Sequence, residues 1–235
     1  MEKRDCGIGR ARRRARPYFL EVQREAHGER VRREIGRDDA PAKADHVGVI
    51  GGSAGGHLSA LVGTAGGKNA FPPIGGNEEQ SDRVQAVCDI FGPADFTTVM
   101  KHAEEDKNVK NIFAFNTPSD PYSSLIGTRL DNRPKAEAVS PVHYVSKDNP
   151  PFLILHGTHD TLVPYQQSVQ LAAALKEQGV PVWLQTLPGS GHGGPAFSNH
   201  KVLQLTQNFF DKHLKGADVT VELVPELDVA VGPEN

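Results

Sequence analysis

One serine stands among four glycines at the point where an apolar run gives way to a helical pattern. The run VGVIG at residues 47–51 is followed by GSAGG at 52–56. Gly51-Gly52-Ser53-Ala54-Gly55 is therefore a G-x-S-x-G motif with Ser53 at its centre. Glycines this dense cost backbone entropy and need a steric reason. After a strand and before a helix, the motif lifts a serine hydroxyl above a tight turn, where it can act as a nucleophile. The N–H of Ala54 would then point at a developing oxyanion.

A serine hydroxyl needs a base, and two later loops contain suitable residues. Asp160 follows the apolar run FLILH at 152–156, and His192 lies in the loop PGSGHGG, which follows the run at 181–187. Open α/β sheets assemble their sites at the carboxyl ends of their strands. The order Ser53, Asp160, His192 is also that of an α/β-hydrolase triad. We therefore predict Ser53 as nucleophile, His192 as general base and acid, and Asp160 as the residue that orients it.

Other residues compete for roles at such a site. Asp89 and Asp95, both in the segment DIFGPADF, are rival candidates for the acid, and Asp95, which lies in a loop beyond a strand, is the alternative to Asp160. We expect His57, four residues after the serine, to pack or cap rather than to touch substrate, and His156 to be structural. Trp183 is expected in the core. Phe113 and Phe115 are candidates for a pocket wall.

Metal and phosphate sites find little support in the motifs. The glycine turn lacks the lysine of a P-loop and the spacing of a Rossmann fingerprint. The ten histidines are scattered, with no HExxH arrangement, and the two cysteines, Cys6 and Cys88, form no CxxC motif. We therefore predict no metal and no cofactor, and no disulfide framework.

Strand and helix patterns alternate downstream of residue 45, which predicts a mostly parallel sheet flanked by helices. Residues 100–148, rich in Lys, Asn, Pro and Ser, break this rhythm. We predict that they form a helical insertion and surface loops within a catalytic domain of residues 45–216, followed by a tail at 217–235. The predicted strands are 47–51, 84–91, 152–156 and 181–187, and the predicted helices are 54–64, 166–178 and 199–214.

The first 44 residues differ in composition from the rest. They contain eleven of the fourteen arginines and few apolar residues. A basic arm for nucleic acid or acidic lipid is one interpretation. Acidic residues are interleaved, however, so we favour a polar helical or disordered extension and predict no nucleic-acid binding.

Length and composition suit a protein with one substantial core. The chain has 235 residues, 37% of them hydrophobic, and a net charge of −3, so it has no bulk attraction to nucleic acid or anionic membranes. No stretch approaches the roughly 18 apolar residues of a membrane span, and the first 20 residues lack the apolar core of a signal peptide. Without such a signal the chain as it stands would be cytoplasmic, but the sequence leaves the compartment open.

From about residue 44 to residue 215 the chain resembles the esterase/lipase group of the α/β-hydrolase superfamily, particularly bacterial carboxylesterases of the acetyl-esterase and feruloyl-esterase type. The resemblance implies the same roles for Ser53, Asp160 and His192, with Ala54 N–H as one oxyanion donor. It also implies a small ester substrate with a short acyl or aryl group, and family members are often exported. The matching segments are GGSAGGHLSALVGT, VQAVCDIFGPADF, SPVHYVSKDNPPFLILHGTHDTLVP and LPGSGHGG.

The chain also departs from that family. Its members have several strands before the serine turn, and a His-Gly-Gly stretch there supplies further oxyanion donors. The nearest string here is AHGER at 26–30, which has a single glycine. We therefore predict fewer strands on the N-terminal side and an open strand edge that favours a homodimer. The alternatives to an active esterase are a weak or inactive hydrolase with a binding role and, less favoured, a serine peptidase.

Overall fold

The computed structural model describes residues 46–72, 80–109, 120–127 and 130–225. Its strands form one sheet in which all neighbours are parallel, in the order β1-β2-β3-β4. The predicted fold class is confirmed. The strands are β1 (Gly48–Gly52), β2 (Ala86–Ile90), β3 (Phe152–Gly157) and β4 (Val182–Leu187), and the helices are α1 (Ala54–Ala65), α2 (Val99–Glu105), α3 (Pro121–Ile126), α4 (Arg133–Ala138), η2 (Pro141–Tyr144), α5 (Tyr165–Glu177), η3 (Pro195–Ser198) and α6 (His200–Lys215).

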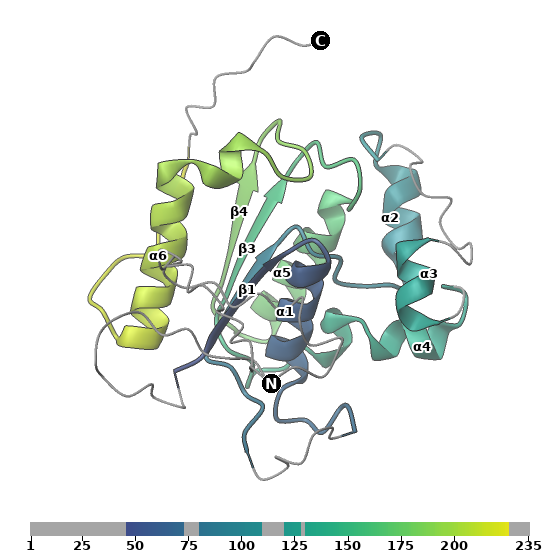
Figure 1. The fold of residues 1–235 in the computed structure, drawn as a ribbon, viewed down its shortest axis with the longest axis horizontal. Helices are drawn as coiled ribbons and strands as arrows, with labels where there is room; N and C mark the ends of the chain where they lie inside the picture. The colour runs from purple at the N-terminus through teal and green to yellow at the C-terminus, as the bar shows by residue number, and fades with distance from the viewer. Residues whose placement is uncertain (1–45, 73–79, 110–119, 128–129, 226–235) are drawn as a thin grey trace, which may run out of the picture.

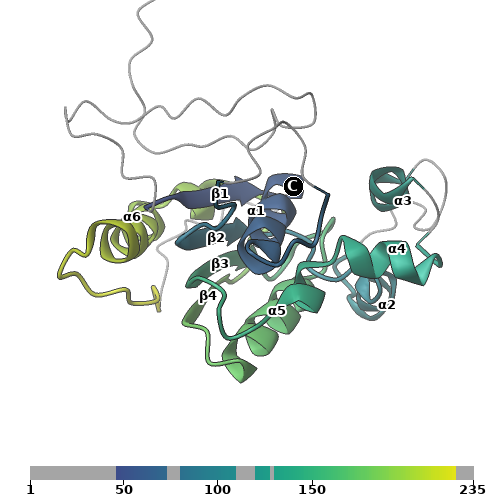
Figure 2. The same ribbon diagram turned by 90° about the horizontal axis from the view of Figure 1, so that it is seen from below.

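Helices cover both faces of the sheet (Figures 1 and 2). In β3, Leu153 and Leu155 belong to the apolar cluster on the α6 face, whereas Phe152 and Ile154 belong to the cluster shared with α1 and α5. Successive side chains of a strand point to opposite faces, so a strand buried on both sides needs a continuous apolar run. This is why the segment FLIL at residues 152–155 is apolar throughout and does not alternate between apolar and polar residues.

All four predicted strands are present, and where their ends differ from the predicted ends, the difference is one or two residues. The largest difference is in β2, which begins two residues later than predicted, at Ala86, and also ends one residue early, at Ile90, although an apolar side chain follows. Phe91 has φ 46°, a left-handed conformation that no regular strand accommodates. The strand therefore turns away at Phe91, which places the next residues above the edge of the sheet.

The described part of the predicted insertion is helical. α2, α3, α4 and η2 lie between β2 and β3 in the chain, and Figure 1 shows α2, α3 and α4 beyond the α1 and α5 side of the sheet. α3 begins at an Asp120 cap, whose carboxylate accepts hydrogen bonds from the N–H groups of Tyr122 and Ser123. These helices share a small apolar cluster with the loop after β2: Phe96, Val99, Tyr122, Ile126, Leu130 and Ala136.

β1 lies at one edge of the described sheet, with β4 at the other, and no strand precedes Gly48 within the ranges that the structure describes. Pairing of two copies across this edge stays a prediction. The arginine-rich segment 1–44, with Cys6, and the candidate pocket residues Phe113 and Phe115 lie outside the described residues.

The described part of the predicted tail lies against β4. The N–H of Val224 donates to Gln185 Oε1 at 2.6 Å, and Gln185 Nε2 donates to the Val224 carbonyl at 3.0 Å. Because the Gln185 side chain is buried, this pair of bonds fixes the tail residues to the α6 face of the sheet.

Candidate active site

Ser53 occupies a strained turn between β1 and α1. Its φ and ψ are 56° and −119°, outside the regions that L-residues favour, and its N–H donates to the Ile90 carbonyl at 2.9 Å. The backbones of β1 and α1 approach closely here. A Cβ atom on Gly51 would lie only 2.4 Å from the carbonyl carbon of Gly55, so no larger residue fits at position 51 without a shift. The glycines thus allow the approach, and the strained turn keeps the Ser53 side chain at the sheet edge.

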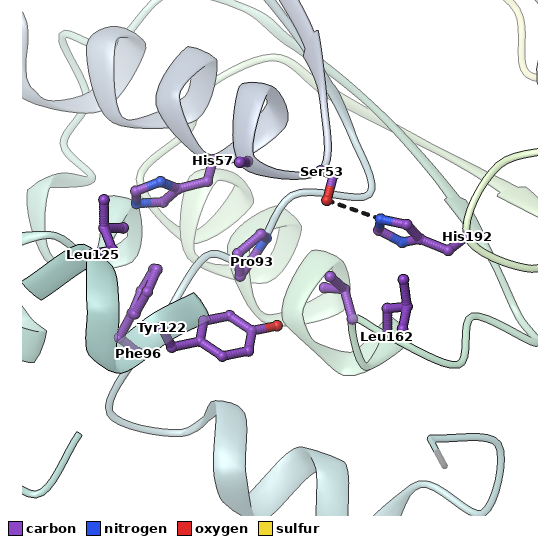
Figure 3. A pocket seen from close by; sticks show the side chains of 10 residues that line it. Ser53, His57, Pro93, Phe96, Tyr122, Leu125, Leu162 and His192 are labelled. Carbon is purple, nitrogen blue, oxygen red and sulfur yellow. Dashed lines mark hydrogen bonds between the residues drawn. The ribbon is translucent and has the colours of Figure 1, made fainter. Parts of the chain in front are cut away.

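The structure brings Ser53, His192 and Asp160 into one hydrogen-bonded chain. His192 Nε2 lies 2.8 Å from Ser53 Oγ, the contact drawn in Figure 3, and His192 Nδ1 lies 2.7 Å from Asp160 Oδ2. A carboxylate can only accept, so Nδ1 carries the proton. In the neutral ring Nε2 is then the acceptor for the Ser53 hydroxyl, which is the arrangement that a general base requires.

Asp160 is buried, and donors reach both of its oxygens. The N–H groups of Leu162 and Val163 donate to Oδ1 at 2.8 and 2.9 Å, while His192 and His156 approach Oδ2. Burial by itself would raise the pKa of the Asp160 carboxyl, but these hydrogen bonds outweigh burial and hold that pKa well below its ordinary value. Asp160 is therefore ionised at neutral pH.

Asp95, the alternative acid, has other partners. It accepts from the N–H and hydroxyl of Thr97 at 2.8 and 2.6 Å, and from Gln170 Nε2 at 2.7 Å. His143 lies 3.6 Å away. These contacts hold the loop after β2, and it is Asp160 that His192 contacts.

Ala54 is the first residue of α1, so its N–H belongs to the helical turn whose donors lack partners within the helix. It lies beside Ser53 on the wall of a cavity. The positive end of the helix dipole and this N–H both favour negative charge at that point.

The cavity in front of Ser53 has a volume of about 240 Å³ and mostly apolar walls. Tyr122 and Leu125 enter it from α3, Leu162 and Val163 from the loop after Asp160, and Figure 3 shows Leu125 and Tyr122 across the cavity from Ser53 and His192. Its lining is Ser53, Ala54, His57, Pro93, Phe96, Tyr122, Leu125, Leu162, Val163 and His192.

His57 forms part of that wall and is also tightly packed, as the sequence suggested. Its side chain is almost fully buried, its Nε2–H donates to the Val139 carbonyl at 2.7 Å, and its ring centroid lies 4.9 Å from that of Phe96. Burial lowers the pKa of the imidazole, an effect that the bond to Val139 only partly offsets. Trp183 packs against Phe209 on the α6 face, away from the cavity.

Two residues near the site could not be recognised from the sequence. The Phe91 ring lies 4.5 Å from the His192 ring, and Gln167 on α5 accepts from the N–H groups of Ala94 and Asp95 at 2.9 and 2.8 Å. Gln167 thereby fixes the loop that carries Pro93 into the cavity wall. Both residues act through contacts between elements distant in sequence, which no local motif marks.

Within the described residues, no group of three or more His, Cys, Asp or Glu side chains is arranged so that it could hold a metal ion. In the same ranges, no helix is both long enough and apolar enough to cross a membrane.

The chain is similar to known esterases in both structure and sequence. A structure described as a truncated form of a carbohydrate esterase from gut microbiota shares 30% identity and a TM-score of 0.62, over 72% of this chain and 59% of that one. A bifunctional GH43-CE from Bacteroides eggerthii shares 30% identity and a TM-score of 0.59, over 70% of this chain and 21% of that one. The fold is therefore that of the α/β-hydrolase esterases, and the resemblance seen in the sequence is confirmed.

A family model described as BD-FAE matches residues 40–175, more than half of the chain, so the chain belongs to this family. Esterase LipQ of Mycobacterium tuberculosis (strain ATCC 25618 / H37Rv) is 33% identical over 149 residues, which make up 63% of this chain and 32% of LipQ. The chain thus spans about a third of the length of that relative.

Proposed function

We propose that this protein is a serine hydrolase that cleaves carboxylic esters through Ser53, His192 and Asp160. The observation that carries the proposal is their hydrogen-bonded chain, with contacts of 2.8 and 2.7 Å, at the wall of an apolar cavity. Relatives named as esterases, such as LipQ, support the same reaction class.

The first half of the reaction forms an acyl-enzyme. Ser53 Oγ attacks the ester carbonyl carbon while His192 Nε2 takes the hydroxyl proton, and the carbonyl oxygen becomes an oxyanion. The N–H of Ala54 donates to this oxyanion at the start of α1. As the intermediate collapses, His192 returns its proton to the leaving alkoxide, which departs as an alcohol.

The second half repeats these steps with water. His192 takes a proton from water, the hydroxide attacks the acyl carbon, and the proton passes to Ser53 Oγ as the ester bond to the serine breaks. Asp160 stays ionised throughout, holds the Nδ1–H tautomer and stabilises the imidazolium that forms twice in each cycle.

The cavity favours short acyl chains or small aryl groups. Its volume of about 240 Å³ is below the roughly 300–1,000 Å³ of pockets that bury drug-sized ligands. Its walls are largely apolar, and Phe96 and Leu125 stand on the side opposite Ser53. We therefore propose acetyl to butyryl esters as substrates and expect octanoyl esters to be poor ones.

The test compares the wild type with Ser53→Ala on p-nitrophenyl acetate, butyrate and octanoate. Loss of the nucleophile should lower kcat/KM by several orders of magnitude, since the remaining residues act as a unit with it. Circular dichroism would verify that the variant is folded. Hydrolysis by the wild type no faster than by Ser53→Ala would contradict the proposal and favour a binding role for the cavity.

A further inference from the structure

Asp160 contacts a second histidine besides His192. His156, at the end of β3, is fully buried, and its Nε2 lies 3.3 Å from Asp160 Oδ2 and 3.1 Å from the Val163 carbonyl. On its other side, His156 Nδ1 lies 2.7 Å from Ser168 Oγ on α5. Two serine–histidine pairs therefore meet at one carboxylate oxygen.

The partners of His156 fix where its proton sits. The Val163 carbonyl and the ionised Asp160 both accept only, so Nε2 carries the proton and shares it between them. Ser168 can then donate its hydroxyl hydrogen to Nδ1. This places an Nε2–H donor on the carboxylate oxygen that also accepts from His192 Nδ1.

The remaining neighbours of His156 are aromatic edges and uncharged groups. Phe91 and Tyr165 present their rings at centroid distances of 6.5 and 5.6 Å, both edge to face. The Tyr165 hydroxyl is paired with Thr186 Oγ1 at 2.6 Å. Among the described residues, Asp160 is thus the ionised group that His156 contacts, and His192 is the titratable group beyond it.

We propose that His156 is a positioning residue for the reaction, acting through Asp160, an inference that rests on the proposed function. Its Nε2–H orients the carboxylate and takes up part of the negative charge on Oδ2. That charge is what holds the protonated form of His192. His156 thereby sets how readily His192 releases the proton to the leaving group.

Two amide variants separate this role from simple space filling. The Nε2 of Gln in His156→Gln reaches about where the His Nε2 lies and keeps a donor for Asp160, whereas the shorter Asn in His156→Asn reaches only toward Ser168. We expect His156→Gln to retain most activity and His156→Asn to lose about tenfold in kcat/KM, as expected for one hydrogen bond to a charged group. The acid limb of the pH profile should move to higher pH in His156→Asn only.

Ser168→Ala is the matched control, because it removes a partner of the same buried ring without touching Asp160. Its pH profile should coincide with that of the wild type. If His156→Asn and His156→Gln have the same pH profile and the same kcat/KM, the inference is overturned. The loss of hydrolysis in Ser53→Ala would still support the proposed function.

Nitrogen NMR of the wild type tests the inference without turnover and without a variant. We expect a protonated Nε2 and an unprotonated Nδ1 for His156. A protonated Nδ1 with a bare Nε2 would remove the donor to Asp160 and overturn the inference, even if Ser53-dependent hydrolysis is absent.

Discussion

Asp160 and Asp89 are buried carboxyl groups whose surroundings move their pKa values in opposite directions. Donors reach both oxygens of Asp160 and keep it ionised. Asp89 on β2 accepts only from the Gly92 N–H at 2.9 Å, and its Oδ2 has no hydrogen-bond partner among the described residues. Burial therefore raises the pKa of Asp89 to about 7, although the Gly92 bond opposes the shift.

The raised pKa of Asp89 predicts that rising pH destabilises the fold. The folded state keeps the Asp89 proton up to about pH 7, whereas the unfolded chain releases it near 3.8. The folded state binds more protons between these values, so this residue lowers the free energy of unfolding as pH rises, by roughly 4 kcal/mol. The difference in free energy of unfolding between Asp89→Asn and the wild type, measured by urea titration, should therefore shift in favour of the variant as the pH rises from about 4 to about 7.

Asp95→Asn is the control for that series. Hydrogen bonds outweigh burial at Asp95 and lower its pKa, so above about pH 5 its proton is released in both the folded and the unfolded state. The difference in free energy of unfolding between Asp95→Asn and the wild type should therefore stay constant above about pH 5. If the difference in free energy of unfolding between Asp89→Asn and the wild type also stays constant with pH, the raised pKa of a buried Asp89 carboxyl is contradicted.

At the scale of elements, the distance between β1 and α1 determines where the Ser53 hydroxyl lies. Gly51→Ala would place a Cβ 2.4 Å from the Gly55 carbonyl carbon, so strand and helix must separate. We expect a loss of about 1–3 kcal/mol in the free energy of unfolding. The shift of Ser53 should also lower kcat/KM by about 10²-fold, as misplacement of reacting groups does.

Gly55→Ala provides the comparison four residues further along the same motif, at the start of α1. A Cβ at Gly55 meets nothing within 4 Å, and its helical position favours alanine by roughly 0.5–1 kcal/mol. Thermal unfolding and ester hydrolysis should therefore show a loss of stability and activity for Gly51→Ala but not for Gly55→Ala. Equal behaviour of both would show that the close approach of β1 and α1 does not position Ser53.

The four strands and the helices α1, α5 and α6 could be predicted from the sequence because their patterns are local. The run FLIL is continuous since β3 is buried on both faces, and glycines mark the Ser53 turn and the His192 loop. The contact of His156 with Asp160 has no such mark. It depends on how the loop after β3 folds back, and the sequence shows only a histidine at the end of an apolar run.

At the scale of the whole molecule, the cavity is assembled from segments far apart in the chain. The sheet edge contributes Ser53 and His192, while α3 in the segment between β2 and β3 contributes Tyr122 and Leu125 (Figure 3). Composition indicated that residues 100–148 interrupt the strand–helix alternation, but which of their side chains face Ser53 depends on tertiary packing. Cavity size and lining therefore came from the structure alone.

The central claim is that His192 and Asp160 activate Ser53 as a nucleophile, and a fluorophosphonate probe tests it most directly. Ser53 Oγ would attack the phosphorus and fluoride would leave, so peptide mapping by mass spectrometry locates the adduct. We predict one adduct on Ser53 in the wild type and a much slower reaction in folded His192→Ala, because an unassisted serine hydroxyl is a poor nucleophile. A folded wild type that leaves Ser53 unmodified, or reacts no faster than His192→Ala, would contradict the account.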